Sequence, residues 1–378
     1  MRRLLLSILT ISLVLSSTGC AQLSYYAQAT QGQLGLVASA RPIGEWLADP
    51  KVSDQLKRRL SRTQEIRRFA VQALDLPDNG SYTRYAELNR PYVVWNVIAT
   101  PELSMKPVQW CFPVAGCVDY RGYYSKEDAE RFAHQLRSQG HEVRVSGVPA
   151  YSTLGWFNDP VLSTFIAYPE AEVARMLFHE LAHQVAYAPG DTTFNESFAT
   201  TVESIGVEQW LDKHGTPESR GRYHEFRQRK RDFIQLLAQH RERLEQVYTS
   251  DISNDEKRLR KALVLASLKQ SYHELKNEKW NGYTGYDPWF NDPITNAHFV
   301  LVATYEELVP AFQVLYTRSG DLKKFYANVK AIAKQDKAKR RQRLALLMPM
   351  PPSPTVEASE TSTSEAAPTI TAPTAAAQ

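Results

Sequence analysis

Two histidines four residues apart, in the run HELAH at His179–His183, constrain this chain more than any other feature. On an α-helix this spacing places both imidazoles on one face, where they can bind a single metal ion. Glu180 follows the first histidine, a position from which a carboxylate can accept a proton from zinc-bound water. The run therefore predicts a helix that carries a metal centre for hydrolysis.

The sequence around the two histidines supports a helix over residues 170–186. Apolar residues recur there at a spacing of three and four positions, which is the pattern of a helix with one buried face. Pro189 and Gly190 then end the helix. The alternative is an ordinary helix whose two histidines bind no metal. The apolar stripe consists of Val173, Met176, Leu177, Leu181 and Val185.

A catalytic zinc site needs a third protein ligand and one open position. Glu196, in the run FNESFATTVE, is the candidate. If residues 194–206 form a second helix, Glu203 lies on the same face as Glu196, seven positions later. Glu203 is then expected to accept a hydrogen bond from a ligand histidine, although simple pairing on the helix surface is the alternative. The sequence thus predicts Zn²⁺ bound by His179, His183 and Glu196.

The N-terminus reads as a signal peptide over residues 1–19, with Arg2 and Arg3 before an apolar run. The Gly19-Cys20 junction resembles a bacterial lipoprotein cleavage site. That resemblance implies that Cys20 is acylated and anchors the chain in the bacterial cell envelope, on the periplasmic side of the outer membrane. The alternative is a plain secretory signal that is cleaved nearby. A role in binding nucleic acid is not expected for an exported protein.

Cys111 and Cys117 remain once Cys20 is assigned to the anchor. In an oxidising compartment such a pair forms a disulfide. Pro113 and Gly116 lie between the two cysteines and allow the chain to turn back, so we predict a small disulfide loop. A metal site at this pair is less favoured, because no second pair of Cys or His stands at the required spacing.

The rest of the chain predicts an α+β protein that is mostly helical and contains a small mixed sheet. Residues 20–345 are expected to form one unit, with an N-terminal α+β part (20–165) and a mainly helical part (166–345). Residues 91–100 and 142–147 have the composition of strands. Residues 346–378 are rich in Pro, Ser, Thr and Ala and are expected to be a disordered tail. The formal net charge of +4 indicates no strong electrostatic preference for a partner.

Two aromatic segments are candidates for lining the site. Residues 150–163 (AYSTLGWFNDPVLS) are expected to form a strand, either in the core or beside a bound peptide. Within it, Asp159 could meet a substrate amine or could simply shape a turn. Residues 280–299 are dense in aromatics, glycines and prolines. From that segment Tyr286 is our candidate for stabilising the oxyanion, and the alternative is that its ring only packs against the wall of the cleft.

HELAH together with NESFATTVE is similar to the zinc aminopeptidase and thermolysin-like group, whose third ligand sits in an Asn-Glu pair. The longer runs WCFPVAGCVDYRGYY, HELAHQVAY and GDTTFNESFA resemble a family of predicted aminopeptidases found as bacterial lipoproteins. This resemblance implies a zincin-like metallopeptidase fold and a peptide substrate.

The resemblance leaves alternatives open. The Gly-x-Met-Glu-Asn segment that binds the free amine in large aminopeptidases is absent from the sequence. An endopeptidase or a peptidoglycan-peptide amidase therefore stays open, as does an envelope-assembly lipoprotein whose metal site is vestigial.

Overall fold

The computed structural model describes residues 22–113, 116–300 and 307–348, all of which belong to one unit of the chain. The unit is α+β and mostly helical, with three small sheets. None of its described helices is long and apolar enough to cross a membrane. The signal peptide, Cys20 and the C-terminal tail lie outside the described residues, so those calls stay predictions. The helices are residues 22–39, α2 (Ile43–Ala48), α3 (Asp54–Leu74), α4 (Lys126–Ser138), α5 (Glu170–Val185), α6 (Thr192–His214), α7 (Pro217–Thr249), α8 (Asn254–Glu274), the π-helix η1 (Leu275–Lys279), α9 (Asp287–Phe290), α11 (Val309–Ser319), α12 (Leu322–Ala333) and α13 (Lys337–Ala345).

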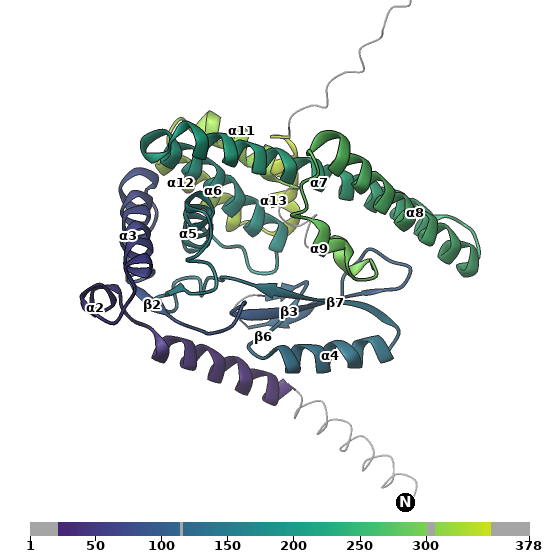
Figure 1. The fold of residues 1–378 in the computed structure, drawn as a ribbon. Helices are drawn as coiled ribbons and strands as arrows, with labels where there is room; N and C mark the ends of the chain where they lie inside the picture. The colour runs from purple at the N-terminus through teal and green to yellow at the C-terminus, as the bar shows by residue number, and fades with distance from the viewer. Residues whose placement is uncertain (1–21, 114–115, 301–306, 349–378) are drawn as a thin grey trace, which may run out of the picture. The chain divides into compact units, whose positions relative to one another are not determined.

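The antiparallel sheet β6-β3-β7 lies between α4 on one side and the paired helices α5 and α6 on the other (Figure 1). Alternate residues of β3 point to α4, because successive side chains of a strand face opposite sides. Val97 lies opposite Val145 in the ladder and packs in one cluster with Ala129 and Ala133 of α4. The expected strands at 91–100 and 142–147 are confirmed, with small shifts of their ends. The strands of this sheet are β3 (Val94–Pro101), β6 (Arg121–Tyr123) and β7 (His141–Val148).

The two other sheets are short. β4 (Trp110–Phe112) and β5 (Gly116–Val118) form a hairpin in which Cys111 and Cys117 face each other and are joined by a disulfide. β1 (Arg41–Pro42) pairs antiparallel with β2 (Arg84–Ala86), which pairs parallel with β8 (Val161–Leu162). The expectation of a strand across residues 150–163 was wrong for most of that segment. Only its last residues form a strand, and the rest is an irregular loop in which Leu154 and Gly155 have positive φ.

Helices α5 and α6 form the centre of the larger core, and α3 and α11 pack beside them. Gly206 of α6 makes the close approach possible, because a Cβ there would lie 2.6 Å from the Phe178 ring of α5. A side chain at this point would push the two helices apart. The expected helix at 170–186 is confirmed. The second helix extends beyond the expected 194–206, because α6 runs from Thr192 to His214.

The long helices α7 and α8 pack against each other as a hairpin. Thr216 caps α7, whose first residue is Pro217, and Ser253 caps α8 by accepting a hydrogen bond from the Glu256 amide. Both helices have capped starts, because these side chains satisfy amides that have no partner within the helix. Lys230, near the middle of α7, reaches toward the α5–α6 pair. The hairpin therefore contributes charge to the site as well as packing.

Candidate metal centre

Helix α5 holds both histidines of HELAH on its buried face. His179 and His183 are each 7% exposed, and their ring centroids lie 4.8 Å apart. The Nε2 atoms are 3.2 Å apart, so both rings present the same nitrogen to one point. The helix ends directly afterwards, at Val185, and Ala186 adopts an extended conformation. The short connection that follows brings α6 back against α5.

Two polar contacts fix that connection and the start of α6. The Asn195 side chain bonds the Ala188 backbone twice, accepting from its N–H at 2.7 Å and donating to its carbonyl at 3.0 Å. Asp191 caps α6 and is held by the Arg340 and Arg341 guanidinium groups, each at 3.0 Å. Because both ends of the turn are tied, the residue after Asn195 has a defined position over α5.

That residue is Glu196, whose Oε2 lies 3.1 Å from His179 Nε2 and 3.7 Å from His183 Nε2. One ligand atom from each of the three residues lies within 4.8 Å of the other two. The structure therefore brings together the three side chains expected to be ligands, and this group could bind a metal ion. Two imidazole nitrogens and one carboxylate oxygen fit Zn²⁺ and leave a fourth position open.

Glu203 stands behind the first histidine. Its Oε2 accepts a hydrogen bond from His179 Nδ1 at 2.8 Å, so Nε2 is the ring nitrogen that faces Glu196 and can bind a metal ion. Arg175 Nη1 donates to the same oxygen at 3.1 Å, and Lys230 Nζ lies 4.0 Å from the other oxygen. Burial opposes ionisation, but the charges of Arg175 and His179 lower the pKa of Glu203 to about 2. Glu203 is thus a permanent anion that orients the ligand ring.

The two histidines have different electrostatic environments. Burial opposes protonation of His179, yet its hydrogen bonds with Glu196 and Glu203 raise its pKa to about 10. Burial lowers the pKa of His183 to about 4, so that ring is neutral at pH 7. The site therefore favours positive charge beside the two carboxylates and keeps the second ring in the form that binds metals.

Glu180 lies beside this group but is not tied to it. Its side chain is partly buried, and among the described residues it has neither a hydrogen-bond partner nor an ion pair. Burial raises the pKa of Glu180 to about 7, and the negative charges of Glu196 and Asp159 act in the same direction. A carboxylate with a pKa near neutrality can both accept and return a proton at physiological pH.

Two phenols near the site were missed from the sequence. Burial raises the pKa of Tyr120, and the charges of Glu196 and Glu180 act in the same direction, which shows electrostatic coupling of this phenol to the site. Tyr187 lies at a centroid distance of 6.5 Å from the His183 ring. Its position four residues after His183 was a usable signal. Tyr120 had none, because tertiary packing in one small cluster with Ile98 brings it there.

Tyr286, the expected oxyanion donor, lies in a different cluster. Its ring stacks on Phe233 at a centroid distance of 4.1 Å and lies 5.4 Å from the Trp280 ring. Burial raises its pKa, followed by the charges of Tyr283 and Glu172. The structure thus groups Tyr286 with the aromatic cluster on α7 and does not group it with the three ligands. Its catalytic role stays a prediction.

Fold and site together define a mostly helical α+β protein in which two histidines and a glutamate could bind a metal ion. The family described as "Putative aminopeptidase" matches residues 24–344, and the chain belongs to this family. Neither the curated proteins nor the solved structures contain a significant match to the chain.

Proposed function

We propose that this protein is a zinc-dependent aminopeptidase with a zincin-like arrangement of its ligand helices. The observation that carries the proposal is the convergence of His179, His183 and Glu196 with the unpaired carboxylate of Glu180 beside them. A structural zinc site is normally closed by four protein ligands and needs no free carboxylate nearby. Membership in the aminopeptidase family supports the same reaction class.

Each residue has a distinct role in the proposed reaction. His179, His183 and Glu196 hold the ion, which supplies a Lewis acid that polarises the scissile carbonyl and acidifies a water molecule. Glu180 accepts a proton from the attacking water and returns it to the nitrogen of the leaving amine. Glu203 keeps the His179 ring oriented through Nδ1. A phenol near the reacting carbonyl stabilises the developing oxyanion.

Tyr120 is the better supported of the two candidate phenols. Its hydroxyl interacts with the charges of both Glu196 and Glu180, whereas the charged groups around Tyr286 are Glu172, Arg229 and Asp232. An oxyanion donor has to lie beside both the metal ligands and the general base. The electrostatic coupling of Tyr120 to both Glu196 and Glu180 supports it for this role.

We also propose that Cys20 is acylated and holds the enzyme at the periplasmic side of the outer membrane. The support is the N-terminal sequence alone, in which an apolar run precedes Gly19-Cys20. Substrates would then be peptides of the bacterial envelope. Intact-mass analysis of the mature protein tests this. A diacylglyceryl adduct at Cys20 is expected, and a mature N-terminus at another residue would contradict it.

The reaction itself is tested with a mixed peptide library read by mass spectrometry. Zinc-loaded protein is expected to remove residues from free amino termini. A chelator should abolish cleavage, and one equivalent of zinc should restore it. Cleavage only at internal bonds would favour an endopeptidase, and cleavage only of peptidoglycan stem peptides would favour the amidase. Absence of any cleavage by protein with one zinc per chain would contradict the enzymatic proposal.

A further inference from the structure

Two loops meet beside Glu180, on the face of α5 that turns away from Glu203. Residues 79–82 contact α5 through Gln184, which accepts from Asn79 at 2.7 Å and donates to Ser81 at 3.3 Å. Gln184 lies one helical turn after Glu180, so the two side chains share a face. The first loop is therefore anchored next to the general base.

The second loop, residues 152–159, packs against the first. The Tyr82 amide donates to the Asp159 carbonyl at 2.6 Å. Gly80 has no space for a side chain, because a Cβ there would lie 2.5 Å from the side chain of Asn158. These contacts place Asp159 beside Tyr82, and Tyr82 beside the α5 face that carries Glu180.

Asp159 contributes a buried negative charge. Its side chain is 5% exposed, and its two oxygens accept hydrogen bonds from the Thr153 amide at 3.0 Å and the Thr153 hydroxyl at 2.7 Å. Among the described residues, no Lys, Arg or His forms an ion pair with Asp159 or with Glu180. Asp159 is thus a buried carboxylate without a cation, on a loop that packs beside the α5 face carrying Glu180, and a buried charge without a partner is costly.

Tyr82 adds an independent observation. Its side chain is 2% exposed, and its hydroxyl has no hydrogen-bond partner among the described residues. Burial raises the pKa of Tyr82, and the charges of Glu180 and Asp159 act in the same direction. Its φ of 62° is in the left-handed region, which bulky residues rarely adopt except where function requires it. A residue with left-handed backbone therefore carries a buried hydroxyl without a partner at the place where its loop packs against Asp159.

We propose that Asp159 and Tyr82 form the subsite that binds the α-ammonium group of the substrate. An ammonium group brings three N–H donors and one positive charge. Asp159 supplies a charged acceptor, the Tyr82 oxygen supplies a neutral one, and the ammonium charge offsets both nearby carboxylates. This assignment rests on the proposed peptidase function and deepens it, because it makes the free amino terminus the recognised group without a Gly-x-Met-Glu-Asn segment.

The test compares a pentapeptide with a free amino terminus and the same pentapeptide acetylated there. Zinc-loaded wild type is expected to cleave the free peptide at least roughly 100-fold faster, because the acetylated one leaves Asp159 without its charged partner. Asp159→Asn should lower kcat/KM for the free peptide by about 100-fold and leave the slow acetylated reaction unchanged. Asp212→Asn is the matched control, because that carboxylate is 74% exposed at the end of α6.

Binding provides a second measurement that does not depend on turnover. Leucine hydroxamate, which chelates zinc and carries a free amine, should bind Asp159→Asn roughly 100-fold more weakly than wild type. Its N-acetylated analogue should bind both proteins equally. Tyr82→Phe removes only one neutral hydrogen bond, so a smaller loss of about tenfold is expected, again for the free amine alone. This variant keeps the proposal testable if Asp159→Asn fails to fold.

The outcomes separate the subsite from the reaction. If wild type cleaves both peptides equally well, or if Asp159→Asn slows both alike, the ammonium subsite is contradicted while the peptidase function stands. If zinc-loaded wild type cleaves neither peptide, the peptidase function itself is contradicted, and the subsite with it. An unchanged hydroxamate affinity in both Asp159→Asn and Tyr82→Phe would also overturn the subsite.

Discussion

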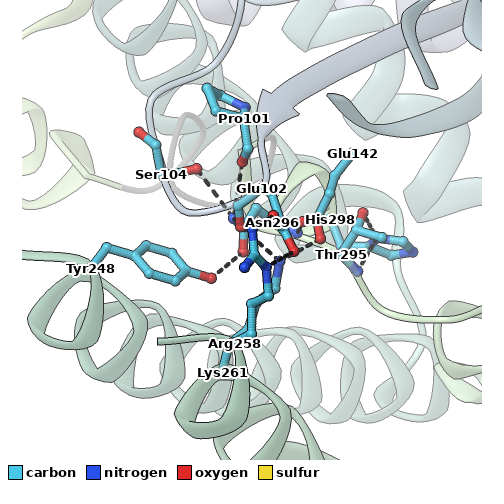
Figure 2. A network of polar contacts seen from close by, with 10 residues as sticks. All are labelled: Pro101, Glu102, Ser104, Glu142, Tyr248, Arg258, Lys261, Thr295, Asn296 and His298. Carbon is cyan, nitrogen blue, oxygen red and sulfur yellow. Dashed lines mark hydrogen bonds and ion pairs between the residues drawn. The ribbon is translucent and has the colours of Figure 1, made fainter. Parts of the chain in front are cut away.

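Two buried polar regions of this protein differ in how fully their groups are paired. The first surrounds Asn296, where the turn after β3 meets the α7–α8 hairpin (Figure 2). None of the ten residues drawn there has a buried side-chain nitrogen or oxygen without a hydrogen-bond partner among the described residues. The second region is the metal centre. There the Tyr82 hydroxyl, His183 Nδ1 and the Thr200 hydroxyl have none among those residues.

In the Asn296 network the buried polar side-chain groups all have hydrogen-bond partners, as expected for a network that stabilises the fold. The Asn296 amide nitrogen lies within hydrogen-bond distance of the carbonyls of Pro101, Glu102 and Ser104, at 2.9 to 3.3 Å. Its carbonyl accepts from the Tyr248 hydroxyl at 2.8 Å. Arg258 holds the Glu102 carboxylate with two bonds, at 2.9 and 3.0 Å, and Lys261 reaches the Glu102 carbonyl at 2.8 Å.

The contrast indicates which buried polar groups stabilise the fold and which take part in the reaction. Native proteins pair nearly all buried polar groups, so unpaired ones in a single region call for an explanation. Three of them, on Tyr82, His183 and Thr200, lie on or next to the helices that carry the candidate ligands. The others among the described residues lie on the β6-β3-β7 sheet or near the N-terminal helices. Substitutions in the Asn296 network should therefore lower the free energy of unfolding, and substitutions at the metal centre should lower the activity. The predictions below test that division.

The largest effect is expected for Glu180→Gln. The amide keeps the shape of the side chain but cannot accept a proton, so kcat should fall about 1000-fold. Zinc content and the free energy of unfolding should be unchanged, because Glu180 contacts no ligand. Peptide hydrolysis and metal analysis on the same sample measure both. A variant with one zinc and wild-type activity would rule out Glu180 as the base.

The next effect compares the two phenols. Tyr120→Phe should lower kcat roughly 100-fold with little change in KM, as expected when an oxyanion donor is removed. Tyr286→Phe should leave kcat nearly unchanged, because its ring packs on Phe233 and Trp280. Steady-state kinetics of the two variants decides between them. The reverse pattern would restore Tyr286 as the donor.

In the Asn296 network, Asn296→Ala should destabilise the protein by about 2 to 3 kcal/mol, because it leaves several buried carbonyls without a donor. Asn296 is fully buried. The activity of the folded fraction should not change. Urea unfolding followed by kinetics well below the transition measures both, with Asn254→Ala on the exposed start of α8 as the control. A loss of activity without loss of stability would contradict the assignment of the Asn296 network to stability alone.

Glu203→Gln should weaken zinc binding by roughly 10 to 100-fold, since outer-sphere partners of ligand histidines have effects of that size. Glu172→Gln is the matched control. Glu172 bonds the same Arg175 guanidinium, at 2.9 Å, but makes no bond to His179. Competition with a chromophoric chelator measures the zinc dissociation constants. Equal losses of zinc affinity in both variants would mean that pairing with Arg175 determines the affinity and that the hydrogen bond to His179 does not.

The smallest effect concerns pH and His298, beside Asn296. Burial lowers the pKa of His298 to about 3, and Nδ1 accepts from the Thr295 amide at 3.1 Å. The unfolded ring has a pKa near 6.5, so between about pH 6.5 and 3 the unfolded chain binds more protons than the folded one. The stability that a neutral His298 contributes is full above about pH 6.5 and is lost as the pH falls toward 3.

His298→Gln should therefore flatten the decline in stability between pH 7 and 5. Urea unfolding at both values measures the slope, with the exposed His134→Gln as the control. If His298→Gln and wild type show the same slope, His298 is not the titrating group.

Much of the site could be predicted from the sequence because its geometry is local. HELAH fixes two ligands within one helical turn, and the short PGD turn returns α6 directly over α5. Glu196 and Glu203 then follow from helical spacing. The strands at 91–100 and 142–147 were also local signals, so their positions were predicted to within a few residues. The disulfide depends on two cysteines six residues apart.

Tyr82 and Tyr120 escaped prediction because they depend on contacts that are distant in sequence, whereas Asp159 was expected as a possible contact of a substrate amine. Tyr82 and Asp159 meet through the packing of two irregular loops, and neither loop has a repeating pattern. Tyr120 reaches the centre through a small cluster around Ile98. The prediction of a strand over residues 150–163 was wrong because its aromatic residues suggested burial in a sheet. In the structure Trp156 is 72% exposed on a loop.

Anomalous diffraction from crystals of the zinc-loaded protein, recorded on both sides of the zinc absorption edge, tests the central claim most directly. The account predicts one strong peak per chain, bonded to Nε2 of His179, Nε2 of His183 and the Glu196 carboxylate, with a non-protein ligand in the fourth position. A peak at another place, or four protein ligands around the ion, would contradict a catalytic metal centre.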